Sequence, residues 1–276
     1  MTLSRFFIEQ TGDRKLDKAK LPTMYDLPSE DPEEPGLPDE FHDLQPQLLS
    51  ATLRLTKVAQ DQIFTGTDLN LYYDVDHPLW HKRPDWFAAL NVPRLYDGSD
   101  LRLSYVVWQE GVSPSVIVEL LSPGTEKEDL GETISLAGDP PTKWDVYEQI
   151  LKVPYYVLYD RYSGALVGYQ WIDGQYQTLE IENNRLWLTD LKLGLGLWQG
   201  EYLGIPRKWL RWIDEQGQWI PTPLEVAQQQ RVQAEQRTVQ AQQQRVQAEQ
   251  EREKAREELA RLAAKLRELG IDPDNF

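Results

Sequence analysis

The feature that most constrains the fold is an almost unbroken apolar run, SVIVELLS, at residues 115–122. Side chains alternate between the two faces of a strand, and both faces of this run are apolar. Such a run is typical of a strand that is covered on both sides. One carboxylate, Glu119, stands in its middle, where an unpaired charge would be costly. The run therefore predicts a central strand in which Glu119 meets a partner or a metal ion.

The neighbouring segments predict an α/β fold, with a central mixed sheet flanked by helices. Hydrophobic patterning indicates helices at 41–59 and 143–152, and strands at 63–76, 83–90 and 153–160. Three further strands are expected at 165–171, 176–181 and 184–188, with DG and NN as the turn signals between them. These three strands predict an added β-meander.

The two ends of the chain differ in composition from the middle. Residues 1–41 are acidic and Pro-rich, and they predict a poorly ordered lead-in. Residues 42–222 are expected to form the domain. Residues 223–276 are rich in Gln, Arg and Glu and predict a helical tail that resembles a coiled coil, with Gly270 as its stop.

The tail repeats with a period of seven residues. The segment QQQRVQAEQ occurs at 228–236 and again at 242–250. Arg and Thr interrupt the seam in its first part, and apolar residues fill it only near the end. Those residues are Leu259, Leu262, Leu266 and Leu269. Self-association is therefore expected only over about 255–269, with an isologous homodimer as the simplest closed assembly.

Composition narrows the function classes. The formal net charge of −16 weakly opposes nucleic-acid binding, which depends on Lys and Arg. The charge is unevenly spread, however: eight acidic residues and no basic one lie between Lys20 and Arg54, and the charge of this stretch says little about the surface of the domain. The chain has no Cys, which excludes disulfides and thiolate zinc sites and fits a cytoplasmic protein. No signal peptide or stretch of about 18 apolar residues is evident, so no membrane partner is expected.

Three polar residues fall on successive predicted elements. Asp85 heads one strand, Glu119 lies inside the next buried strand, and Lys143 opens the following helix. Two converging carboxylates can hold Mg²⁺, which prefers oxygen ligands and keeps several waters. A nearby Lys can orient the attacking water or stabilise charge on a phosphate. By composition alone this pattern is weak, because a chain of this size offers many such triples.

The segments RPDWFAAL, SVIVELLSPG and KWDVYEQILKVPYYVLYD together resemble the Uma2 family of the PD-(D/E)XK restriction-endonuclease-like superfamily. The matching elements are Pro84-Asp85, Glu119 to Ser122-Pro123, and Lys143 to Tyr147. The resemblance covers roughly 42–220, and the tail ending LRELGIDP is also similar to members of this group. Four separated elements agree in order and context.

The resemblance implies an endonuclease that hydrolyses DNA phosphodiesters with Mg²⁺, or Mn²⁺ in its place. It implies Asp85, Glu119 and Lys143 as catalytic residues and Asp85, Glu119 and Asp68 as metal ligands. One departure matters: the superfamily's simplest form has a Lys two residues after the strand carboxylate, and Leu121 occupies that position here. The resemblance then implies that Lys143 supplies the amine from the helix.

Several alternatives compete with these interpretations. Glu119 and Lys143 could form a structural ion pair without a metal. The chain could be a non-catalytic scaffold or DNA-associated module that assembles through its tail. A glycosidase with Asp85 and Glu119 as acid and base is the weaker enzyme hypothesis. Zinc binding by His77 and His81 is disfavoured because Pro78 opposes a helix there.

Two further groups of residues have simple structural interpretations. His42 is expected to be a surface or capping residue at a helix start. A Trp cluster could form a base-stacking platform, but packing of the meander against the main sheet is favoured. The cluster comprises Trp171, Trp187, Trp198, Trp209, Trp212 and Trp219.

Overall fold

A six-stranded mixed sheet forms the centre of the computed structural model, which describes residues 39–122, 126–133, 135 and 138–269. Its strand order is β1-β4-β6-β7-β8-β9, in which β6 and β7 are parallel and the other neighbours are antiparallel. The strands are β1 (Ile63–Thr67), β4 (Trp86–Leu90), β6 (Val116–Leu120), β7 (Tyr155–Tyr159), β8 (Leu166–Ile172) and β9 (Gln175–Thr178). The expected α/β architecture with a central mixed sheet is confirmed.

Two smaller sheets lie beside the main one. One contains β3 (His81–Lys82), β2 (Leu71–Tyr72) and β5 (Tyr105–Val106). The other contains β10 (Arg185–Leu188), β11 (Leu193–Tyr202) and β12 (Ile205–Ile213). The prediction of one meander was therefore wrong in its third strand, since β8 and β9 extend the main sheet whereas β10 joins the separate sheet. The long hairpin of β11 and β12 in this separate sheet was not predicted from the sequence.

Different elements cover the two faces of the main sheet. Helix α1 (Glu40–Thr52) and the β10–β12 sheet cover one face, where Leu48 and Trp209 pack with Val118. The other face is covered by α4 (Lys143–Asp145), the following π-helical turn η3 (Val146–Ile150) and the small sheet. Tyr147 packs there with Ile117. Because β6 is buried along its whole length, its apolar sequence is explained.

Three short helical segments complete the domain: η2 (Gln60–Gln62), α2 (Val107–Glu110) and α3 (Glu126–Asp129). The expected helix at 41–59 ends early, because Leu53 adopts an extended conformation and lies buried with Leu55 packed nearby. The expected strand at 63–76 is broken at Asp68, whose φ of 47° is left-handed.

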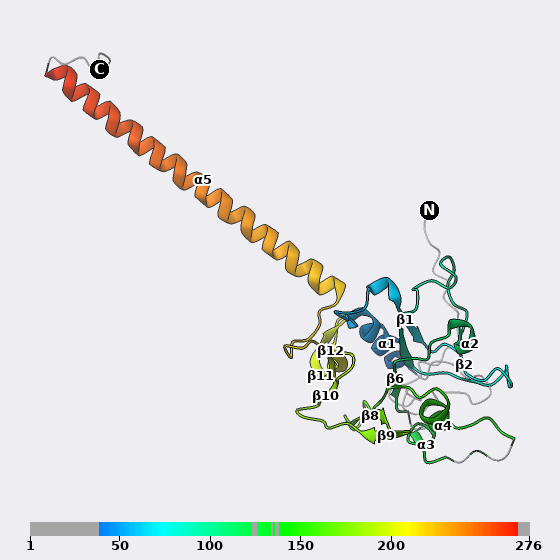
Figure 1. Cartoon of the computed structure of the whole chain (residues 1–276). Coiled ribbons are helices and arrows are strands. Elements are labelled where there is room, and N and C mark those ends of the chain that lie inside the picture. Colours follow the sequence, from blue (N-terminus) through cyan, green and yellow to red (C-terminus); the bar gives the residue numbers. More distant parts are fainter. Residues whose placement is uncertain (1–38, 123–125, 134, 136–137, 270–276) are drawn as a thin grey trace, which may run out of the picture.

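The tail forms one helix, α5 (Pro223–Glu268), which projects away from the domain (Figure 1). At 46 residues it is about 70 Å long. Thr222 caps it through a reciprocal pair of hydrogen bonds with Glu225, and the buried Arg211 binds the same Glu225 carboxylate. The acidic lead-in lies outside the described residues up to residue 38. Within the described part of the chain, no helix is both long and apolar enough to span a membrane.

Candidate active site

The candidate site lies where the beginning of β4 meets the end of β6. These strands are antiparallel, with Trp86 opposite Val118. The next pair of residues, Asp85 and Glu119, therefore lies side by side. The backbone N–H of Asp85 donates to Glu119 Oε2 at 3.1 Å. In return, the N–H of Leu120 donates to Asp85 Oδ2 at 2.6 Å. Each carboxylate is thus fixed by a main-chain donor from the strand that carries the other.

Glu119 is fully buried, and each of its two carboxylate oxygens accepts a hydrogen bond. Besides the Asp85 N–H on Oε2, its Oε1 accepts a hydrogen bond from the Tyr147 hydroxyl at 2.9 Å. The Lys143 Nζ lies 3.3 Å from the same oxygen. The structure therefore brings together all three residues predicted to be catalytic: Asp85, Glu119 and Lys143.

The local helix geometry presents Lys143 and Tyr147 to the same carboxylate. They are four residues apart and so share a helix face. Thr142 and Asp145 form a capping box that starts α4 at Lys143. The wider π-helical turn that follows leaves Ile150 exposed, although a regular helix would have placed it on the buried side. The predicted helix at 143–152 is confirmed in position.

Asp129 is a site residue that the sequence did not single out. Its Oδ1 lies 2.7 Å from Lys143 Nζ, a shorter contact than that between Lys143 and Glu119. Asp129 is buried at the end of α3, and its carbonyl accepts a hydrogen bond from the Tyr156 hydroxyl at 2.9 Å. The only sequence signal was its place in the acidic loop between β6 and α4. Several acidic residues there were equivalent by composition.

Burial and neighbouring charges shift the pKa of Glu119, Asp85 and Lys143. Burial raises the pKa of Glu119 well above its usual value, and the nearby carboxylates of Asp129 and Asp85 add to the rise. Burial also raises the pKa of Asp85, against the opposing charge of Lys143. Burial alone would lower the pKa of Lys143, but the surrounding carboxylates raise it above its usual value. Three carboxylates thus face one ammonium, which leaves the cluster short of positive charge.

Asp68 lies next to this cluster, with its carboxylate engaged elsewhere. Its backbone N–H lies 3.2 Å from the Pro84 carbonyl and 3.3 Å from that of Asp85. Its Oδ2 is 2.7 Å from Arg83 Nη2 in an ion pair. The structure therefore places Asp68 beside the candidate site and does not join its carboxylate to those of Asp85 and Glu119.

Comparison with known proteins identifies the family. The model of the Uma2 family, described as "Putative restriction endonuclease", matches residues 16–206. The chain belongs to the Uma2 family. The matched segment contains Asp85, Glu119, Asp129 and Lys143.

A solved structure gives a weaker similarity. It is a crystal structure described as "a putative nuclease belonging to DUF820" from Anabaena variabilis, 13% identical and covering 53% of this chain and 70% of its own, with a TM-score of 0.36. No curated protein matches the sequence.

The donor set fits a hard cation held by few protein ligands. Among the residues that the structure describes, no three His, Cys, Asp or Glu side chains are grouped to hold a metal together. Mg²⁺ is commonly bound through one or two carboxylates, with waters and substrate phosphates completing its shell. Asp85 and Glu119 can supply that pair; burial raises the pKa of both carboxyl groups, and a bound cation would favour their ionised forms.

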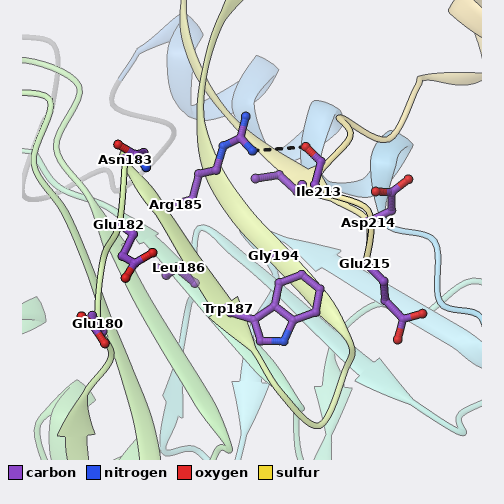
Figure 2. A pocket seen from close by; sticks show the side chains of 11 residues that line it. Glu180, Glu182, Asn183, Arg185, Leu186, Trp187, Gly194, Ile213, Asp214 and Glu215 are labelled. Carbon is purple, nitrogen blue, oxygen red and sulfur yellow. Dashed lines mark hydrogen bonds between the residues drawn. The ribbon is translucent and has the colours of Figure 1, made fainter.

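The Trp cluster does not form a surface suited to nucleic acid. Trp209 and Trp212 are fully buried in the core between the sheets, whereas Trp187 is 40% exposed. Figure 2 shows Trp187 in an open pocket of about 480 Å³ on the β10–β12 sheet. Its lining includes four carboxylates, from Glu180, Glu182, Asp214 and Glu215. These would repel phosphates, so a base-stacking role for Trp187 is disfavoured in this Uma2 protein.

Proposed function

We propose that this chain is a metal-dependent endonuclease that hydrolyses phosphodiester bonds in DNA, with Mg²⁺ as its ion and Mn²⁺ as a substitute. The observation that carries the proposal is the buried cluster of Asp85, Glu119, Asp129 and Lys143, in which three carboxylates face one ammonium. Strongly perturbed carboxylates of this kind are typical of functional sites. Membership of a family described as restriction endonucleases supports the same reaction class.

Asp85 and Glu119 are the residues proposed to hold the ion. Both raised pKa values return toward normal when a cation neutralises them, so metal binding and ionisation favour each other. When bound, the ion supplies Lewis-acid polarisation of the phosphate and a more acidic water. Asp68 could contribute an oxygen only after its ion pair with Arg83 breaks. We therefore propose it as an additional ligand that binds the ion more weakly than Asp85 and Glu119.

Lys143 is proposed to act as a charged donor. The neighbouring carboxylates keep it protonated, so it is poorly suited to remove a proton from water. As an ammonium it can orient the attacking water and stabilise negative charge on the phosphate. Asp129 holds Lys143 at 2.7 Å, and Tyr147 fixes Glu119 at 2.9 Å. Leu121, at the usual strand position of the Lys, cannot take this role.

A non-catalytic scaffold is the second candidate. It is favoured by Leu121 and by the closed set of contacts among Glu119, Lys143 and Asp129, which could be purely structural. The scaffold would keep the fold and the tail without cleaving DNA. The two candidates therefore differ in metal-dependent activity.

The deciding experiment is cleavage of supercoiled plasmid DNA with Mg²⁺, with Mn²⁺ and with EDTA. The wild-type chain, Asp85→Asn and Glu119→Gln are compared with Glu110→Gln as the matched control. Glu110 is also a buried carboxylate, but it pairs with Arg102 in a different part of the fold. The nuclease proposal expects activity in the wild type and the control only. Absence of cleavage with either ion, in a folded wild-type chain, would favour the scaffold.

A further inference from the structure

A histidine on the opposite face of the sheet lies directly behind the carboxylate cluster. His42, in the first turn of α1, is only 2% exposed. Its Nε2 lies 2.9 Å from the carbonyl oxygen of Leu120, the residue next to Glu119. Its Nδ1 lies 2.9 Å from Asp39 Oδ1. The expectation of a simple surface or capping residue was wrong, because the side chain is buried and reaches β6.

Both ring nitrogens of His42 face oxygens that can only accept a hydrogen bond. A backbone carbonyl has no proton to donate. An Asp side chain, with an ordinary pKa of about 3.9, is ionised at neutral pH, so this carboxylate is also an acceptor alone. A ring nitrogen without a proton would face either oxygen with a lone pair. The geometry therefore favours protons on both nitrogens, which would make the ring an imidazolium.

Charged groups from several elements surround this ring. Asp39 precedes α1 and pairs through Oδ2 with Arg161, which follows β7, at 2.6 Å. Asp85 at the head of β4 attracts the His42 charge, and Asp68 after β1 also interacts with it. Burial lowers the pKa of His42, but its hydrogen bond to Asp39 and the attraction of Asp85 raise it above its usual value. Acidic groups thus outnumber Arg161 around His42.

We propose that His42 is a positioning residue of the candidate site, an imidazolium that fixes the end of β6 beside Asp85 and Glu119. Leu120 is held twice, since its N–H donates to Asp85 Oδ2 and its carbonyl accepts from His42 Nε2. The His42 contact thereby fixes the main chain at Leu120. This part of the main chain lies next to Glu119 and carries the N–H that donates to Asp85. The consequence for catalysis rests on the proposed nuclease function, whereas the charge and the contact do not.

Two neutral substitutions separate the two hydrogen bonds of the ring. The amide nitrogen of His42→Gln reaches about as far as Nε2 and can still donate to the Leu120 carbonyl. The shorter amide of His42→Asn corresponds to Nδ1 and can donate only to Asp39. Both variants lose the charge, so a difference between them reports the Leu120 contact. His77 provides the matched control, because its Nδ1 lies 2.7 Å from Asp74 but its side chain is 50% exposed.

The first measurement is ¹⁵N NMR of the histidine rings in the full chain at pH 7. The chain has three histidines, and the spectrum of His42→Gln identifies the signals of His42. We expect two protonated ring nitrogens for His42. A neutral ring with one protonated nitrogen would overturn the imidazolium.

The second measurement compares hydrogen exchange of the Leu120 amide with cleavage rate. His42→Asn is expected to exchange this amide about tenfold faster and to lose about tenfold in kcat, the scale of one lost hydrogen bond, with little change in KM. His42→Gln should stay within about threefold of wild type in both. His77→Gln and His77→Asn should equal wild type.

The outcomes separate this inference from the proposed function. Equal exchange rates in His42→Gln and His42→Asn would overturn the positioning role, even if the wild type cleaves DNA. A wild type that cleaves no DNA would overturn the nuclease proposal. In that case the exchange rates and the ring spectrum would still decide the role of His42 in holding β6.

Discussion

At the scale of single residues, the contacts of Glu119 determine what the loss of its charge does to Lys143. Its carboxylate is fully buried, and its contact with Lys143 at 3.3 Å is longer than the 2.7 Å contact between Lys143 and Asp129. Loss of the Glu119 charge therefore leaves Lys143 with its closer partner. Asp129, rather than Glu119, is therefore the closer partner of Lys143.

We predict that Glu119→Gln abolishes DNA cleavage without destabilising the metal-free fold. Removing a buried charge of raised pKa relieves repulsion from Asp85, and Asp129 still neutralises Lys143. Thermal unfolding in EDTA should give a melting temperature equal to wild type or up to about 4 °C higher. Glu110→Gln should instead lower the melting temperature while the chain stays folded, because Arg102 loses its carboxylate and keeps the Pro93 and Arg94 carbonyls. A clear loss of melting temperature in Glu119→Gln would favour a structural ion pair.

The second residue-scale prediction concerns His42 and pH. Its folded pKa is raised, so the protonated form binds its neighbours more strongly in the native state. This contribution is complete below the unfolded pKa of about 6.5 and is lost as the pH rises through the folded pKa. The free energy of unfolding by urea should therefore favour wild type over His42→Gln most strongly at pH 6, with the difference shrinking toward pH 9. A difference that grows with pH would contradict this assignment.

At the scale of elements, the π-helical turn after α4 supports the site. It keeps Tyr147 fully buried, with its hydroxyl on Glu119 Oε1. Tyr105 is a comparable residue in the same apolar cluster, since it is also fully buried and its hydroxyl donates to the Val112 carbonyl at 2.8 Å. These two tyrosines allow the function of one hydroxyl to be separated from its contribution to stability.

We predict that Tyr147→Phe lowers kcat about tenfold, because Glu119 loses a donor that stabilises its ionised form and its orientation. Tyr105→Phe should leave kcat unchanged. Each substitution should lower the free energy of unfolding by about 1 kcal/mol, the net worth of one hydrogen bond. Plasmid cleavage and urea unfolding of both variants test this pairing. Equal activities would show that the Tyr147 hydroxyl serves stability alone.

The elements also show which features local sequence can predict. Strand β6 was evident because its apolar run must be covered on both sides, and the cluster around Glu119 followed from a motif with fixed order. The β11 and β12 hairpin was missed because Gly residues and alternating polar groups weaken its strand pattern. Asp129 and His42 could not be assigned, because their partners, Lys143 and Leu120, are defined only by the tertiary fold. Sequence therefore predicted the central elements better than the contacts between them.

At the scale of the whole molecule, α5 separates the domain from a distant apolar stripe. No described residue of α5 is buried, and two of the leucines near its end are exposed, Leu259 at 67% and Leu262 at 53%. Leu266 and Leu269 continue the same spacing of three and four residues. In contrast, Val239 lies in the earlier, Gln-rich part and is 58% exposed. Side chains are exposed in both parts of α5, but only the end of the helix has leucines at the seam positions.

We predict that the chain forms a dimer through the end of α5 and that Leu262→Glu with Leu266→Glu makes it monomeric. Two charges in the seam would be desolvated without partners on pairing, whereas Val239→Glu places one on a face outside that seam. Light scattering over a range of protein concentrations should show an unchanged dimer for Val239→Glu. Circular dichroism checks that each variant stays helical. Two heptads alone pair weakly, so the dimer should dissociate on dilution into the micromolar range. A dimer that persists in the Leu262 and Leu266 variant would assign assembly to the domain, and would leave α5 as a projecting arm for each subunit.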